Sequence, residues 1–173
     1  RSLPHSAWRC NPLGDGMHAA PIPKPLSRHS TWSTINGSNI GLHSMGIAMF
    51  SHVMVGVKDL EASKKFYEAV LGTVGIAPGM ANNQRYFYRS PTGTFGITTP
   101  INGEAASVGN GSTYGFKATS PEQADAFHAA GVAHGGVTCE DPPGWREGAA
   151  GKLYLAYLRD PDGHKICVLH RPG

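Results

Sequence analysis

Alternation of apolar and polar residues marks the first patterned segment of the chain. Residues 50–57, Phe-Ser-His-Val-Met-Val-Gly-Val, alternate as a half-buried strand does. Asp59 then has the character of a helix N-cap, and apolar residues recur at three- and four-residue steps as far as Leu71, just before Gly72. The pattern predicts a strand that leads directly into a helix.

The same pattern returns 61 residues further along the chain. Residues 112–116 match 51–55, and Phe127 stands where the first copy has Phe66. Residues 120–123, Ser-Pro-Glu-Gln, form a capping box with proline in the first helical position. The chain therefore repeats one strand and helix unit.

Each predicted helix is followed by a predicted hairpin. Aromatic and β-branched residues flank the turn sequences Pro-Thr-Gly and Pro-Asp-Gly, and glycine accepts the positive φ that such turns impose. The expected strands are 85–89, 94–98, 152–158 and 165–170, around turns at 91–93 and 161–163. Each unit thus consists of a strand, a helix and about three strands, and segment 141–148 is predicted to be a long loop of the second unit.

The chain of 173 residues divides at its first strand. Residues 1–48 are rich in Ser, Gly and Pro and show neither helical nor strand periodicity, which predicts an unstructured leader or upstream-derived segment. Residues 49–173 are predicted to form one domain, with its first module at 49–103 and its second at 108–171.

Composition and charge narrow the function classes. With 40% hydrophobic residues the chain can build a core, and the net charge of +3 resides in residues 1–48, so that 49–173 lack the basic excess of a nucleic-acid surface. No apolar run approaches the roughly 18 residues that a membrane span requires. Three cysteines form no disulfide framework. We therefore expect a cytoplasmic protein that binds neither nucleic acid nor membrane.

Residues 50–67 and 153–167 carry a family resemblance. They resemble the opening and closing signatures of the vicinal oxygen chelate superfamily, which includes glyoxalase I, bleomycin-resistance proteins, fosfomycin-resistance enzymes and extradiol dioxygenases. The resemblance implies an α+β fold in which two βαβββ modules form a curled mixed sheet around a cup. It also implies a small-molecule ligand and a homodimer.

The resemblance also implies a metal site with one ligand from the first and one from the last strand of each module. These positions fall on His52, on Thr113, on Cys167, and on Ile97 or Gly96 depending on the register. Only His52 matches, and a catalytic ion usually requires three protein ligands. We therefore expect no cofactor, with a zinc, nickel or iron ion held by His52 and Cys167 as the other interpretation.

Two functions are compatible with this pattern. The first is a glyoxalase-like lyase or isomerase in which His52 acts as general acid or base, and the retained histidine favours it. The alternative is a metal-free binding protein that resembles the bleomycin-resistance proteins.

Further candidates would contact a substrate. In segment 141–148, Trp145 is expected to stack on a flat ligand and Arg146 to clamp a carboxylate or phosphate, unless Arg146 pairs with Glu147 or Asp141 instead. The cup wall is expected to include Thr113, Tyr114, Tyr154 and Cys167. A free cysteine is either a reactive thiol or a small buried apolar group, and the second interpretation is favoured.

Overall fold

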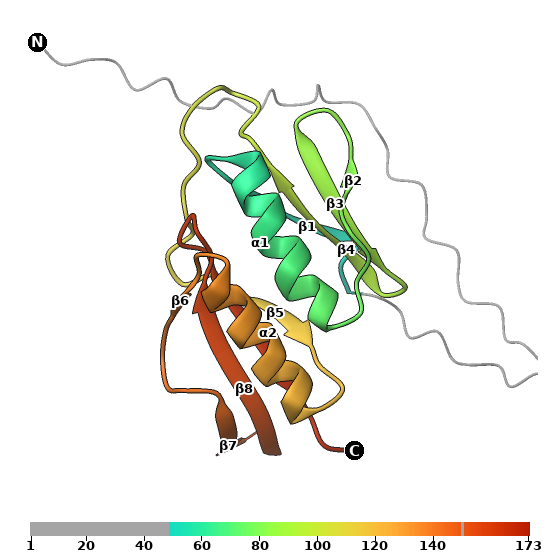
Figure 1. Ribbon diagram of the computed structural model, residues 1–173, viewed down its shortest axis with the longest axis vertical. Coiled ribbons are helices and arrows are strands. Elements are labelled where there is room, and N and C mark those ends of the chain that lie inside the picture. Colours follow the sequence, from blue (N-terminus) through green and yellow to red (C-terminus); the bar gives the residue numbers. More distant parts are fainter. Residues whose placement is uncertain (1–48, 150) are drawn as a thin grey trace, which may run out of the picture. The chain divides into compact units, whose positions relative to one another are not determined.

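A computed structural model describes residues 49–149 and 151–173 (Figure 1). The leader predicted at 1–48 lies outside the described residues. Within them the chain forms two helices and nine strands. A strand, a helix and then further strands occur twice in this order, with one additional strand in the second copy, so the predicted α+β fold of two βαβββ modules is confirmed.

The first module forms a mixed sheet of four strands. Its elements are β1 (His52–Gly56), α1 (Leu60–Thr73), β2 (Met80–Ala81), β3 (Arg85–Ser90) and β4 (Gly93–Thr98). The strand order is β1-β4-β3-β2, with β1 parallel to β4 and the other pairs antiparallel. The α1 helix begins at Asp59, whose carboxylate accepts hydrogen bonds from the amides of Glu61 and Ala62.

The second module repeats this arrangement. Its elements are β5 (Tyr114–Lys117), α2 (Pro121–Ala133), β6 (Val137–Thr138), β7 (Gly144–Gly148), β8 (Gly151–Arg159) and β9 (Lys165–His170). The order is β5-β9-β8-β6, and β7 also pairs with β8. In the described residues the two modules thus form two separate sheets, each with its first strand at an edge.

The prediction of a long loop at 141–148 was wrong. Gly144–Gly148 form β7, which pairs antiparallel with β8 and places Trp145 opposite Tyr154. Gly151, with a φ of 86°, supplies the positive φ that the tight connection requires. Charged residues interrupt any apolar alternation in this segment, so its strand character was not visible in the sequence.

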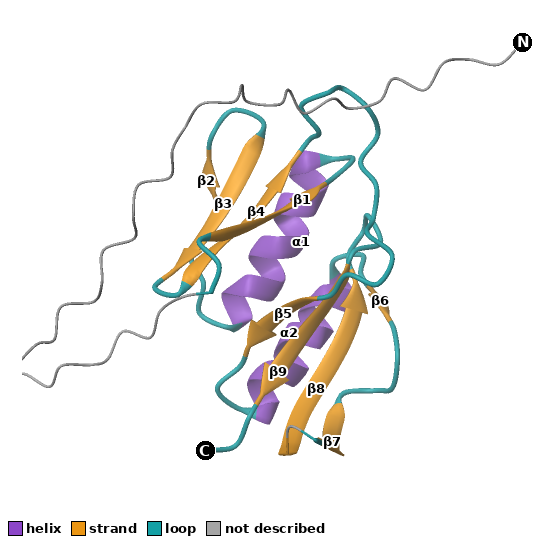
Figure 2. Cartoon of the chain, turned by 180° about the vertical axis from the view of Figure 1, so that it is seen from behind, coloured by secondary structure: helices purple, strands orange, loops and turns teal. Residues whose placement is uncertain are grey.

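Both helices cover the same side of their sheets, as Figures 1 and 2 show from opposite directions. Residues of both modules contribute to one buried core. At Gly131 of α2, an added Cβ would lie 2.3 Å from Leu158 Cδ1 and 3.3 Å from Val70 Cγ1. The absence of a side chain there lets α1, α2 and β8 approach closely.

The turn between β8 and β9 links the two modules. Its Asp162 carboxylate accepts hydrogen bonds from the Lys58 amide at 2.9 Å and from Ser63 Oγ at 2.8 Å. Asp160 is buried and accepts a hydrogen bond from the Tyr67 hydroxyl at 2.6 Å. Burial is the main cause that raises the pKa of Asp160.

His164 makes a further link from this turn. Its Nε2 lies 2.7 Å from the carbonyl oxygen of Gly56 in β1 and donates to it, while its buried Nδ1 has no hydrogen-bond partner in the described chain. The Pro-Asp-Gly segment therefore forms the predicted tight turn, and its flanking side chains join β9 to the first module.

Candidate functional site

His52 lies on the sheet face opposite the helices, which we call the cup face. Val55 of the same strand is buried in the core, and strand residues alternate between faces, so His52 points the other way. Its side chain is exposed, and its Nδ1 lies 2.9 Å from Ser51 Oγ. In the described part of the chain Nε2 has no protein partner and is open to a ligand.

The strand register resolves the fourth family position. Cys167 lies opposite Gly115 in the β5·β9 pair, and the equivalent residue of β1, Met54, lies opposite Gly96. Gly96 is therefore the counterpart of Cys167, whereas Ile97 is fully buried in the core. The spacing of the two hairpins in the sequence did not decide between Ile97 and Gly96, because the turn between β8 and β9 is longer than the turn between β3 and β4.

These positions do not fit the family's metal. Gly96 has no side chain, and a Cβ there would lie 2.3 Å from Met54 Sδ, so methionine occupies the space that a ligating side chain would need. Thr113 is a poor donor for a catalytic ion. Within residues 49–149 and 151–173, no three His, Cys, Asp or Glu side chains lie close enough to share an ion.

Cys167 is surrounded by protein groups rather than by a cavity. The side chain is buried, and burial is the main cause that raises the pKa of its thiol, against the lowering effect of a hydrogen bond with Tyr157. Its Sγ lies 3.6 Å from the carbonyl oxygen of Val168. Near neutral pH the residue is therefore a thiol and not a thiolate.

Arg146 is occupied by contacts within its own module. Its guanidinium donates to the carbonyl oxygens of Leu155 at 2.9 Å and Asp141 at 3.0 Å, and its Nε lies 4.0 Å from the Asp141 carboxylate. This arrangement corresponds to the pairing alternative considered for Arg146. The side chain fixes the segment before β7 to β8.

Trp145 and Tyr154 lie on the helix side of the second sheet. The Tyr154 hydroxyl donates to Asp125 of α2 at 2.7 Å, and its ring is 5.3 Å from that of Trp145 in an edge-to-face arrangement. Neither residue lines either of the two pockets to which Thr113 contributes.

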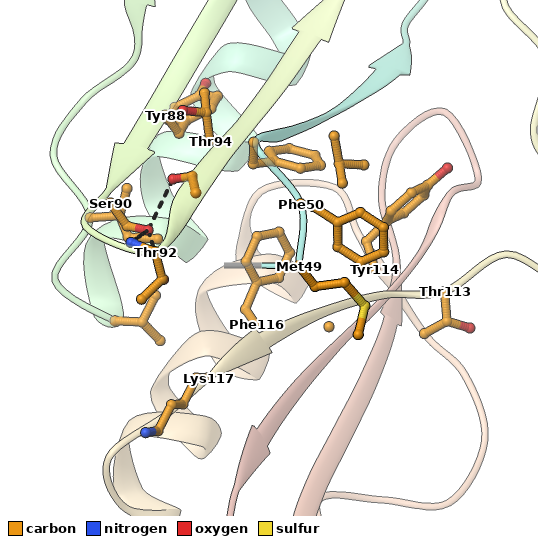
Figure 3. A pocket seen from close by; sticks show the side chains of 16 residues that line it. Met49, Phe50, Tyr88, Ser90, Thr92, Thr94, Thr113, Tyr114, Phe116 and Lys117 are labelled. Carbon is orange, nitrogen blue, oxygen red and sulfur yellow. Dashed lines mark hydrogen bonds between the residues drawn. The ribbon is translucent and has the colours of Figure 1, made fainter. Parts of the chain in front are cut away.

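A cavity of about 670 Å³ lies where the first module meets β5. We call it the seam pocket. Figure 3 shows Met49, Phe50, Tyr114 and Phe116 gathered at its centre, with Thr113 and Lys117 on either side. Its wall is largely apolar, with threonine and serine hydroxyls at the rim.

Two of the predicted contact residues, Thr113 and Tyr114, line the seam pocket. His52 is not among the lining residues, although its neighbours Phe50 and Val53 are. No sequence signal marks Phe95 or Phe116 as pocket residues, because apolar residues of a strand are expected in the core and the unpaired edges of β1 and β5 could not be foreseen.

The comparisons with known proteins agree with this architecture. The sequence profile of the Glyoxalase/Bleomycin resistance protein/Dioxygenase superfamily matches residues 49–168. The chain therefore belongs to this superfamily. No curated protein matches the chain.

Solved structures support the same assignment. A glyoxalase/bleomycin resistance protein from Albidiferax ferrireducens T118 is 78% identical, with a TM-score of 0.70, over 71% of this chain and 99% of that one. An integron cassette protein from V. Pseudocholerae is 28% identical over 75% and 98% of the two chains, with a TM-score of 0.52. A glyoxalase-related enzyme from Fulvimarina pelagi, at 23% identity and a TM-score of 0.56 over 70% and 87%, shares the fold.

Neither helix of the described residues is both long enough and apolar enough to cross a bilayer.

Proposed function

We propose that this domain binds a small organic molecule in the seam pocket and that binding requires no metal ion. The observation that carries the proposal is the cavity itself, about 670 Å³ with a mainly apolar wall. Cavities of this size and character are typical of small-molecule sites. The superfamily includes both enzymes and binding proteins by its name, so membership alone does not choose between them.

The aromatic wall suits a flat apolar ligand. The rings of Phe95 and Phe116 are 5.3 Å apart in an edge-to-face arrangement, and Tyr114 lies 6.3 Å from Phe95. These contacts hold the rings in place before a ligand arrives, so that little side-chain entropy is lost on binding. Hydroxyl groups of Thr94 and Thr113 could then orient a polar substituent.

Filling the pocket tests this proposal. Gly115 lines the seam pocket on the cup face of β5, where an added Cβ meets no atom within 4 Å, so Gly115→Leu adds bulk at this wall of the pocket without disturbing the fold. Gly148 of β7 has the same open surroundings outside the pocket, which makes Gly148→Leu the matched control.

The probe for this test is naphthamide, titrated calorimetrically into the full chain. We expect Gly115→Leu to weaken binding at least tenfold and Gly148→Leu to leave it unchanged. Equal affinity of both variants and the parent chain would refute a ligand site in the seam pocket.

A second candidate function is that of a glyoxalase-like lyase or isomerase with His52 as acid or base. It is favoured by the contact of His52 Nδ1 with Ser51 Oγ, which orients the ring and leaves Nε2 open on the cup face. Orientation of this kind is what a general base requires. His52→Gln would then abolish turnover in a substrate screen while naphthamide binding persists, and retained turnover would reject the role.

A further inference from the structure

A second, polar pocket of about 370 Å³ adjoins the seam pocket at Thr113, which lines both cavities. Its other walls are the glycine-rich segment 108–112 and the side chains of Arg159 and Lys165. By strand alternation, both cations lie on the same sheet face as Cys167 and Tyr157, the cup face.

The glycine-rich segment offers backbone donors to this pocket. The Ser112 amide and hydroxyl both bond to the Gly109 carbonyl oxygen, at 3.2 and 2.7 Å, and Gly111 has the positive φ of 89° that closes such a turn. The amides of Gly109, Asn110 and Gly111 donate to no acceptor within the described residues. They are therefore free to bond to a ligand.

The two cations lie directly opposite each other. Arg159 and Lys165 are register partners in the antiparallel β8·β9 pair, where like charges repel. Lys165 is paired with the Glu140 carboxylate, whereas Arg159 donates a hydrogen bond from Nη1 to the Gly163 carbonyl oxygen at 2.9 Å. One positive charge at this pocket thus lacks a neutralising carboxylate in the described chain.

We infer that this second pocket, here called the anion pocket, holds an anionic oxygen group, carboxylate or phosphate, of the molecule bound in the seam pocket. Guanidinium, ammonium and turn amides are the donors that such groups prefer. The inference rests on the proposed function, and it makes the ligand an organic anion with an apolar body. The positive charge lies beside Thr113, one of the positions from which the metal donor is missing.

Lys117 is the competing anchor, because it lines the seam pocket itself. Variants separate the two possibilities: Arg159→Gln removes the anion pocket's unneutralised charge, and Lys117→Gln removes the charge at the edge of the seam pocket. Arg85→Gln, an exposed arginine of β3 that lines neither pocket, is the matched control for the loss of one surface charge.

The experiment compares naphthoate with naphthamide, which share an apolar body and differ in charge, by calorimetry on the full chain. We expect naphthoate to bind at least fivefold more tightly than naphthamide. Arg159→Gln should abolish this preference, while Lys117→Gln and Arg85→Gln should retain it. Equal affinities in the parent chain, or a preference that survives Arg159→Gln, would overturn the inference.

Inorganic phosphate distinguishes a free anion from the charged end of a larger ligand. Saturable amide shifts at residues 109–113 that Arg159→Gln removes would show that an anion alone fills the anion pocket. If phosphate behaves in this way while neither naphthyl compound binds, the seam-pocket proposal fails and the anion pocket stands. If naphthamide binds as tightly as naphthoate, the anion pocket fails and the proposed function stands.

Discussion

Single residues explain why two positions of the metal site implied by the family resemblance do not fit an ion. Met54 fills the space above Gly96, and Cys167 is buried as a protonated thiol. Gly96 offers no donor atom, and the Cys167 sulfur is enclosed by protein contacts. At Gly96 and Cys167, two of the four positions that the family resemblance implies, the cup face is therefore filled by packing contacts.

The thiol of Cys167 should react slowly. Its side chain is 6% exposed and burial raises its pKa, whereas Cys139 is partly exposed. We expect iodoacetamide at neutral pH to alkylate Cys139 at least tenfold faster than Cys167, as followed by peptide mass spectrometry. Comparable rates would show that Cys167 is an accessible thiolate.

The buried Asp160 should make stability depend on acid pH. Because its pKa is raised in the folded state, that state binds the proton more tightly than the unfolded chain does. Its stabilising contribution is therefore complete below the ordinary aspartate pKa and is lost as the pH rises through the raised pKa.

Asp160→Asn removes this titration. Urea unfolding across the acid range should show the parent chain losing stability relative to the variant as the pH increases, with the difference constant above the raised pKa. A difference that grows in the opposite direction would contradict the assignment of burial as the dominant cause.

At the scale of elements, helix packing depends on one small residue. Gly131 of α2 packs against Leu158 of β8 and Val70 of α1, which an added Cβ would crowd, whereas a Cβ at Gly72, in the last turn of α1, meets no atom within 4 Å. The two glycines therefore have different roles, although both lie in helices.

Paired alanine substitutions test this difference. Gly131→Ala should cost about 1–3 kcal/mol of unfolding free energy because the new methyl group overpacks the contact. Gly72→Ala should stabilise the chain by up to about 1 kcal/mol through its better helix propensity. Urea unfolding measures both, and equal effects would contradict the close helix approach.

Arg146 connects the segment before β7 to β8 through hydrogen bonds of its guanidinium. Arg146→Lys keeps the charge but loses the planar fork that reaches Leu155 and Asp141. We expect about 1–3 kcal/mol lower stability with unchanged naphthoate affinity. A loss of affinity without a loss of stability would instead make Arg146 a ligand clamp.

The sequence predicted the elements better than the site. Capping at Asp59 and Ser120 and the repeated pattern located both helices, because these signals are local. The segment around Trp145 was missed as a strand because its pairing with β8 is not encoded by alternation. The seam pocket was also missed, since its wall combines residues of both modules and depends on how the modules pack.

At the scale of the whole described domain, the two modules are joined through the core and the β8–β9 turn. The Asp162 carboxylate accepts hydrogen bonds from the Lys58 amide and the Ser63 hydroxyl at the start of α1. The Tyr67 hydroxyl of the same helix donates to Asp160. These bonds fix β5 relative to the first module and so preserve the seam pocket. The pocket is therefore a property of the duplicated fold rather than of either half.

The homodimer that the family resemblance implies is a further expectation at this scale. In the described chain β1 and β5 each pair on one side only, and exposed strand edges favour pairing with another chain. Sedimentation of the full chain would give the oligomeric state directly.

The most direct test of the account is calorimetric titration of naphthoate into the full chain after chelation and again after incubation with zinc, nickel or iron, with elemental analysis of each sample. Because the binding groups are side chains and backbone amides, we predict the same affinity in every sample and no stoichiometric metal. Binding that appears only together with a tightly held ion would contradict the account.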